Sequence, residues 1–283
     1  MNLSYDSPSP LSYFATLVQS DDAFPLLEAA ISLAHDEYPD MDVQQALGEV
    51  DQMQARLKRR IPVDAPPMHR LRVLNQFFFN SLGFGGNVNN YYDADNSYIN
   101  QVLRTRRGIP ISLAVVWLEL AQGLGLSARG VAFPGHFMVK VNLPKGQVVI
   151  NPFDGASLSR DELAERLEPF RRKSGLVDEF EVPLGLYLQA TPPRAIIARM
   201  LRNLKEIYKS QKDWPRQLAV LDRLIILLPQ AWEEHRDRGL AHAELGHNSQ
   251  AVKDLETYLV NAEESMDIDV LADKVEKLRR KVS

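Results

Sequence analysis

The chain has 283 residues, of which 45% are hydrophobic and 25% charged, and it contains no cysteine. This composition is typical of a folded protein, and it excludes disulfides, thiolate metal ligands and a cysteine nucleophile. The net charge of -4 argues against nucleic acid as the main ligand, because duplex-binding proteins usually carry a basic excess. No apolar run reaches the roughly 18 residues of a membrane span, and no signal peptide is visible, so we expect a cytoplasmic protein without membrane contact.

Residues from about Pro10 to Leu82 show a helical pattern. Within 42–60, apolar side chains recur at steps of three and four residues, which is the pattern of one face of a helix. These side chains are Val43, Leu47, Val50, Met53 and Leu57. A further helix is predicted from about Met68 to Ser81, and the glycine cluster that follows it is a stop signal.

The loop over 87–98 superficially imitates a calcium-binding loop through Asp93, Asp95 and Ser97. Such a loop needs a glycine at its sixth position, where Tyr98 stands here. We therefore predict a loop built from Asx turns and no calcium site.

A buried helix is predicted from Pro110 to about Leu124, because the residues in this stretch are apolar nearly all round. Proline suits the first helical position, where its missing N–H costs nothing. After Gly125 the spacing of apolar residues changes to two, which is typical of a β-hairpin.

The turn of this hairpin falls at Pro144-Lys145. If these two residues form the whole loop, Leu143 lies opposite Gly146 across the hairpin. His136 then becomes a diagonal neighbour of Asn151, within reach of a polar contact.

A short helix is predicted from Ser159 to Arg171, with Ser159 and Glu162 forming a capping box. The proline-containing stretch 173–193 reads as a connector. We therefore divide the chain into a core domain over 1–172, this connector, and a second domain over 194–283.

The second domain aligns with itself at a period of 34 residues. Positions of the tetratricopeptide repeat are matched by Leu201, Leu204 and Tyr208 in one unit and by Gly239, Gly246 and Ala251 in the next. Residues 267–283 are predicted to form the cap helix that such arrays require. A generic helical bundle is the alternative, but it leaves the period unexplained.

The segment 108–114, the strand carrying His136 and the segment 150–152 together resemble the transglutaminase-like core, a relative of papain-type enzymes. With its tetratricopeptide tail, the chain resembles bacterial proteins of the SirB type. The resemblance implies an α+β fold. It has a helical N-terminal extension, a transglutaminase/papain-like core with a small antiparallel sheet, and an all-α repeat module.

In that family a cysteine begins a buried helix, a histidine lies on one strand and an aspartate on the next. Carried over residue by residue, these positions fall on Pro110, His136 and Asn151. An asparagine can still orient an imidazole, but a proline cannot act as a nucleophile. The resemblance therefore implies a vestigial catalytic site. Ser112, two residues beyond Pro110, points to another side of the helix.

We therefore predict a non-catalytic protein-binding, scaffold or regulatory protein built on a degenerate core. One alternative is a residual serine-type amide or ester hydrolase that uses Ser112 and His136, and another is a nucleic-acid-linked regulator. The repeat groove is predicted to bind a protein or peptide partner through acidic segments or a free carboxylate. The candidate residues are Arg199, Arg202, Asn203 and Arg236.

No cofactor or metal is predicted. The three histidines of the repeat region, His235, His242 and His247, have a nearest pair five residues apart. This spacing is more typical of surface helix histidines than of metal ligands.

Overall fold

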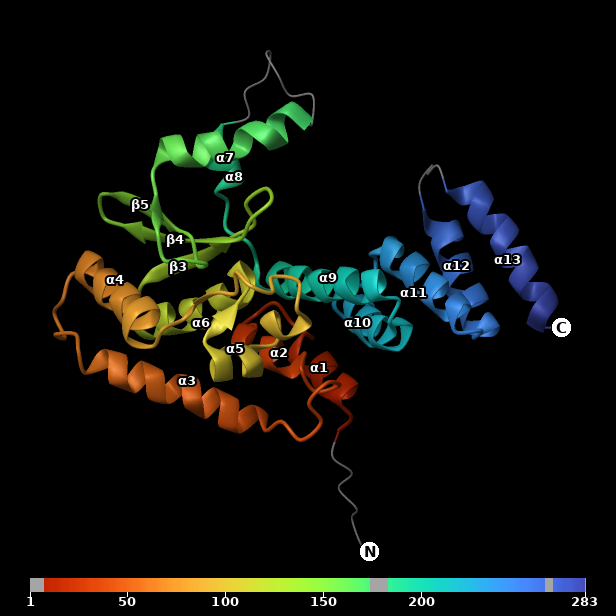
Figure 1. Ribbon diagram of the computed structural model, residues 1–283, viewed down its shortest axis with the longest axis horizontal. Coiled ribbons are helices and arrows are strands. Elements are labelled where there is room, and N and C mark those ends of the chain that lie inside the picture. Colours follow the sequence, from red (N-terminus) through yellow and green to blue (C-terminus); the bar gives the residue numbers. More distant parts are fainter. Residues whose placement is uncertain (1–7, 174–182, 263–266, 283) are drawn as a thin grey trace, which may run out of the picture. The chain divides into compact units, whose positions relative to one another are not determined.

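Figure 1 shows the computed structural model of the chain, which describes residues 8–173, 183–262 and 267–282. The chain divides into two compact units. The core unit contains Phe24–Ile197, and the repeat unit joins Met1–Ala23 to Ala198–Ser283. Among the described residues helices predominate beside two small sheets, so the α+β class predicted from the sequence is confirmed.

The core unit is built around the predicted buried helix. Its helices are α2 (Leu26–Ser32), α3 (Val43–Lys58), α4 (Pro67–Asn75), α5 (Ile99–Thr105), α6 (Pro110–Gly123), α7 (Arg160–Lys173) and α8 (Leu184–Tyr187). A π-helical turn, Gln76–Ser81, continues α4. Helix α6 contacts α2, α3, α4 and α5, and its Trp117 is fully buried. Asp42 caps α3 by accepting hydrogen bonds from the backbone N–H groups that follow it.

Four antiparallel strands form the main sheet in the order β3 (Ser127–Val131), β4 (Met138–Leu143), β5 (Gly146–Ile150) and β6 (Ser157–Leu158). Leu143 pairs with Gly146, so the predicted two-residue hairpin loop and its register are confirmed. Two further short strands, β1 (Gly85–Gly86) and β2 (Arg107–Gly108), pair in parallel just before α6.

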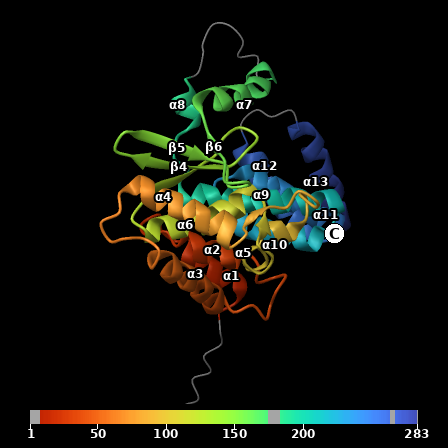
Figure 2. The ribbon, with the colours of Figure 1, turned by 60° about the vertical axis from the view of Figure 1, so that its left-hand side comes forward.

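The main sheet lies between α6 on one face and α7 on the other, as the ribbon in Figure 2 shows. The side towards α7 and α8 is closed by an apolar cluster of Val131, Phe133, Met138, Val149, Leu163, Leu167 and Leu188. The sheet is therefore covered by helices on both faces.

The predicted capping box at the start of α7 is present: Ser159 N donates to Glu162 Oε2 at 2.7 Å, and Glu162 N donates to Ser159 Oγ at 3.2 Å.

Part of the predicted connector is docked on the sheet. Of the stretch 173–193, residues 174–182 lie outside the described residues. Further on, the Leu188 carbonyl accepts a hydrogen bond from Lys140 Nζ at 2.6 Å. Thr191 N donates to Gly130 O at 2.8 Å, and Thr191 Oγ1 accepts from Ala132 N at 2.7 Å. This half of the stretch is thus part of the core unit.

The repeat unit has the helix pairs that the period of 34 residues predicts. Its main helices are α9 (Pro193–Gln211), α10 (Trp214–Leu227), α11 (Trp232–Glu244), α12 (Asn248–Asn261) and α13 (Ile268–Val282). Gly239 is needed where α11 meets α12, because a Cβ there would lie 2.8 Å from Leu255 Cγ. Helix α13 packs on α12 through Leu271, Val275 and Leu278, as expected of a cap helix.

Helix α1 (Pro10–Leu17) belongs to the repeat unit, whereas the sequence-based division placed it in the core domain over 1–172. It packs against α10, with Phe14 fully buried and the guanidinium of Arg223 5.9 Å from the centre of its ring. The sequence of a short amphipathic helix does not indicate which surface the helix packs against. The sequence alone therefore could not assign it.

Candidate functional site

The two polar residues that the resemblance singles out in the core, His136 and Asn151, are in direct contact. His136 follows a tight turn, in which His136 N donates to Phe133 O at 2.9 Å and Gly135 adopts a φ of +70°. Asn151 follows β5. His136 Nε2 and Asn151 Oδ1 lie 2.7 Å apart, so the contact expected from the hairpin register is present.

The hydrogen bonds of Asn151 fix the proton arrangement of this pair. Asn151 Oδ1 also accepts from Phe153 N at 3.1 Å, which identifies this atom as the oxygen of the amide. His136 Nε2 is therefore the donor, and in the neutral ring Nδ1 carries the lone pair. Asn151 is only 5% exposed. An amide oxygen in this position holds the imidazole ring in one orientation.

The first residues of α6 are buried and hydrogen-bonded to neighbouring backbone groups. Pro110 is the first residue of the helix, and it is buried. The fully buried Ser112 hydroxyl donates to Asn96 O at 2.6 Å, with Ile109 O at 3.0 Å as a second acceptor, and accepts from Ile109 N at 3.2 Å. The neighbouring Gly108 has no room for a side chain, because a Cβ would lie 2.7 Å from Ser112 Oγ.

Asn96, which the sequence analysis did not single out, organises the loop before α5. Its side chain donates to the carbonyls of Asn90 and Tyr91 at 2.6 and 3.2 Å, and it accepts from Asn87 Nδ2 at 3.0 Å. It is 3% exposed. Its position in an asparagine-rich loop was visible in the sequence, but its burial was not.

The same loop contains the Asx turn predicted in place of a calcium site. Asp93 Oδ1 accepts from Asp95 N at 3.0 Å, and Asp93 Oδ2 accepts from Asn90 Nδ2 at 2.8 Å. Over the described ranges, no three His, Asp or Glu side chains gather in a way that could hold a metal ion.

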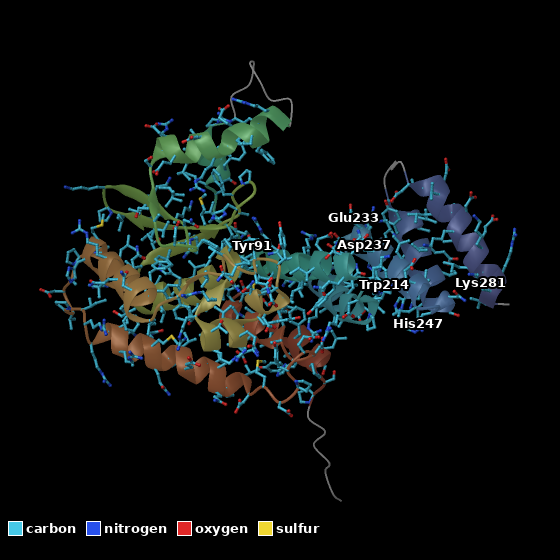
Figure 3. All side chains as sticks on the ribbon, viewed as in Figure 1. Tyr91, Trp214, Glu233, Asp237, His247 and Lys281 are labelled. Atoms are coloured by element: carbon cyan, nitrogen blue, oxygen red, sulfur yellow. The ribbon has the colours of Figure 1, made fainter. Side chains whose placement is uncertain are left out.

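The outer side of the loop presents apolar and aromatic side chains. Val88 is 75%, Tyr91 44% and Tyr92 79% exposed, and the Tyr91 ring lies 6.2 Å from that of Phe153. Phe153 packs over Gly86, whose N–H donates to Phe153 O at 2.7 Å. We call Val88, Tyr91, Tyr92 and Phe153 the aromatic surface; Figure 3 labels Tyr91. Through Phe153, this surface adjoins Asn151.

In the repeat unit, two of the candidate peptide-binding arginines pair with acidic side chains of the chain itself. Arg202 Nε lies 2.8 Å from Glu234 Oε1, and Arg236 contacts Asp237 at 3.0 Å and Asp267 at 3.1 Å. Figure 3 shows Asp237 on α11. Arg199 and Asn203 are half-buried. Recognition of an acidic partner therefore stays a prediction. Such a partner would have to compete with these carboxylates for the two arginines.

The cation at the centre of this network, Lys205, was not predicted from the sequence. Lys205 is 7% exposed and lies 2.8 Å from both Glu234 and Asp237. It occupies the repeat position that Gly239 holds in the second unit. Nothing in the single sequence indicates that this lysine is buried.

The comparisons with known proteins agree with the two-part architecture. Residues 44–202 match the transglutaminase-like superfamily, and residues 204–276 match the tetratricopeptide repeat. No solved structure matches the chain significantly. The fold, the site and these matches define a transglutaminase-like protein with a tetratricopeptide tail.

The curated relatives give a narrower grouping. A UPF0162 protein of Xylella fastidiosa (strain Temecula1) is 39% identical over 240 residues, which is 84% of each chain. A UPF0162 protein of Vibrio cholerae is 26% identical over 258 residues, covering 91% of this chain and 93% of the relative. The UPF0162 protein YchA of Escherichia coli (strain K12) is 25% identical over 266 residues, covering 91% and 94%. The chain belongs to the UPF0162 family. The predicted order of a transglutaminase-like domain followed by tetratricopeptide repeats is thereby confirmed, whereas the SirB-type name is not.

None of the described helices combines the length and apolar character needed to cross a membrane.

Proposed function

We propose that this protein is a non-catalytic binding protein whose degenerate transglutaminase-like core recognises a polypeptide partner. The observation that carries the proposal is the structural use of the start of α6. The chain has no cysteine, Pro110 is the first residue of α6, where the resemblance predicts the nucleophile, and the Ser112 hydroxyl is buried and hydrogen-bonded. The oriented pair of His136 and Asn151 therefore has no nucleophile at that position.

The hydrolase alternative is disfavoured by the same hydrogen bonds. To attack a substrate, the Ser112 hydroxyl would have to leave a fully buried position and give up its 2.6 Å bond to Asn96 O. Leaving a buried acceptor without this bond costs about 1 to 3 kcal/mol, before any chemistry begins. The nucleic-acid alternative gains no support from a chain with a net charge of -4.

The aromatic surface is the place where the core would receive its partner. Exposed tyrosines and phenylalanines are enriched at protein interfaces, where they bury large areas with few rotatable bonds. Here the loop that carries Tyr91 and Tyr92 is held from beneath by buried Asn96. A surface that is already ordered loses less conformational entropy on binding. We therefore place the partner across Val88, Tyr91 and Tyr92.

The repeat unit supports a polypeptide partner as opposed to a small molecule. Tetratricopeptide repeats usually mediate protein interactions, and residues 204–276 match that repeat. The repeat groove is therefore a second candidate contact site, separate from the aromatic surface.

A site-specific crosslinking experiment tests the binding role. A photoreactive phenylalanine analogue is placed at Tyr92 and, as a control, at Val63, which is 96% exposed in the same unit and lies outside the aromatic surface. We expect the Tyr92 position to capture a discrete polypeptide that the Val63 position does not. With that partner purified, Tyr92→Ala should weaken binding about tenfold or more, the effect typical of a well-packed interface tyrosine. Equal capture at both positions, or unchanged affinity, would reject the aromatic surface.

The proposed lack of catalytic activity is tested separately. The protein is incubated with a fluorophosphonate probe and with panels of amide and ester substrates, in parallel with His136→Ala and Ser112→Ala. We expect neither labelling nor turnover above background in any of the three. Turnover that His136→Ala abolishes would overturn the proposal and support the hydrolase.

A further inference from the structure

The turn that ends α11 brings two histidines together. Gly246 follows the helix with a φ of +74°, Gly246 N donates to Ala243 O at 3.2 Å, and His247 N donates to His242 O at 2.9 Å. These are the two hydrogen bonds of a Schellman motif, in which the side chains at the ends of the longer bond face one another. Here those side chains are His242 and His247. Figure 3 labels His247 in this turn.

In most helix ends of this kind the facing pair is apolar. In this chain it consists of two imidazoles, whose Nδ1 atoms lie 3.3 Å apart and whose ring centres lie 5.5 Å apart. His247 is exposed and His242 half-buried, so solvent reaches the pair. Two nitrogens at this distance can share one proton, or they can share a metal ion in its place.

A neutral imidazole is the form of histidine that binds metals, and burial lowers the pKa of His242.

We propose that His242 and His247 form a bidentate site for a divalent transition-metal ion, with Zn²⁺ as the ion that fits best. Zinc binds imidazole nitrogens at about 2.0 to 2.1 Å in tetrahedral geometry, which places two ligand nitrogens roughly 3.3 to 3.4 Å apart. The observed separation of 3.3 Å agrees with this value. A square-planar ion with the same bond lengths would need the nitrogens roughly 2.9 Å apart, which is a poorer match.

The site has two protein ligands. Asp254 lies near His242, but both of its oxygens already accept hydrogen bonds from Arg238 at 2.7 Å. No further His, Asp or Glu among the described residues completes a set of three. Two coordination positions are thus left for water, as in an exchangeable site and unlike a closed structural one.

The sequence analysis predicted no metal here because a spacing of five is wrong for a helix. Residues five apart in a continuous α-helix point about 140° away from each other. The helix ends between the two histidines, however, and the left-handed Gly246 turns the chain back. The juxtaposition follows from the helix end, which spacing alone does not show.

The test is calorimetric titration of the full chain, free of any histidine tag, with Zn²⁺. We expect binding of one ion per chain. His242→Gln and His247→Gln should each weaken this binding at least tenfold, whereas His69→Gln, an exposed histidine on α4, should leave it unchanged. Circular dichroism verifies that each variant is folded.

A second pair of variants separates the geometry from the mere presence of two histidines. Gly246→Ala disfavours the left-handed conformation, whereas Gly246→Asn tolerates it. We expect the alanine variant to bind Zn²⁺ several-fold more weakly than the asparagine variant. No binding by the native chain, or equal binding after both histidines are replaced, would overturn the proposal.

Discussion

The ammonium group of Lys205 on α9 lies 2.8 Å from the carboxylate of Asp237 on α11, and both side chains are less than 10% exposed. Glu234, on the same helix, contacts Lys205 at the same distance. This buried network joins the first helices of two successive repeats. A buried pair is costly to break, because removal of one partner leaves the other charge without compensation.

We predict that Lys205→Met destabilises the repeat unit by about 1 to 3 kcal/mol, since Glu234 and Asp237 would stay buried with only Arg202 and Arg236 as their cationic partners. The triple variant Lys205→Met/Glu234→Gln/Asp237→Asn should recover a large part of this loss. Urea unfolding followed by tryptophan fluorescence measures both. A single variant that costs less than the triple variant would contradict the account.

The pH dependence of this network has a definite sign. Burial opposes the charge of Lys205, but hydrogen bonds and the negative charges of Asp237 and Glu234 outweigh it, so the pKa of Lys205 is raised. Stability from a raised lysine pKa is fully present below the unfolded value of about 10.4 and is lost as the pH rises through the folded pKa. The difference between native protein and Lys205→Met should therefore be constant from pH 7 to about pH 9.5 and shrink only above about pH 10.4.

The assignment of Pro110 to the nucleophile position leads to a further prediction. Pro110→Cys places a thiol at the first residue of α6, where the helix dipole favours the thiolate, and where the resemblance predicts that the imidazole of His136 does so too. We expect its pKa to fall below the free value of about 8.5. The pH profile of iodoacetamide alkylation measures this, with Val63→Cys in an exposed loop as the reference. An unshifted profile in a folded variant would reject the assignment of Pro110.

Removal of the Ser112 hydroxyl should loosen the start of α6. Ser112→Ala deprives Asn96 O of its 2.6 Å hydrogen bond, at a cost of about 1 to 3 kcal/mol. Hydrogen exchange of the α6 amides measures the effect. Ser210→Ala, which removes an exposed hydroxyl bonded to Ile207 O, should change stability by less than about 0.5 kcal/mol. Equal effects of the two would show that the Ser112 bond has no special importance.

The charge balance of the repeat groove leads to a prediction about acidic peptides. Arg202 is 48% exposed, but its guanidinium already contacts Glu234. If the groove does prefer acidic segments, Glu234→Gln should tighten their binding by releasing Arg202, and Arg202→Glu/Arg236→Glu should abolish it. Fluorescence anisotropy with an acidic-tailed peptide library measures both. Identical binding by all three proteins would leave the repeats a structural role.

Helix α1 should contribute strongly to the repeat unit. Phe14 is fully buried against α10, so Phe14→Ala should destabilise this unit by about 3 to 5 kcal/mol. The adjacent Tyr13, which is only half-buried, provides a control, and Tyr13→Ala should cost less. Hydrogen exchange of α10 peptides distinguishes this effect from a change in the core unit.

Features determined by local rules were predictable from the sequence. The apolar run identified α6, and the Pro144-Lys145 turn set the hairpin register that brings His136 to Asn151. The bond from Ser112 to Asn96 O was not predictable, because the partner is a main-chain atom in an irregular loop. Lys205 is buried because a helix of the next repeat packs over it. The repeat period predicts that helix, but it does not indicate that the lysine is buried.

The repeat unit is discontinuous along the chain, and this has a consequence for synthesis on the ribosome. Helix α1 emerges before the core unit, but α10, which it covers, emerges only after the whole core unit has been made. At about 5 to 20 residues per second, the apolar side chains of α1 wait on the order of ten seconds or more for their partner. During that interval Phe14 and Val18 lack their final packing and are open to chaperones or to other nascent chains. A helix made before the core unit therefore reaches its native contacts only after the core unit has been made.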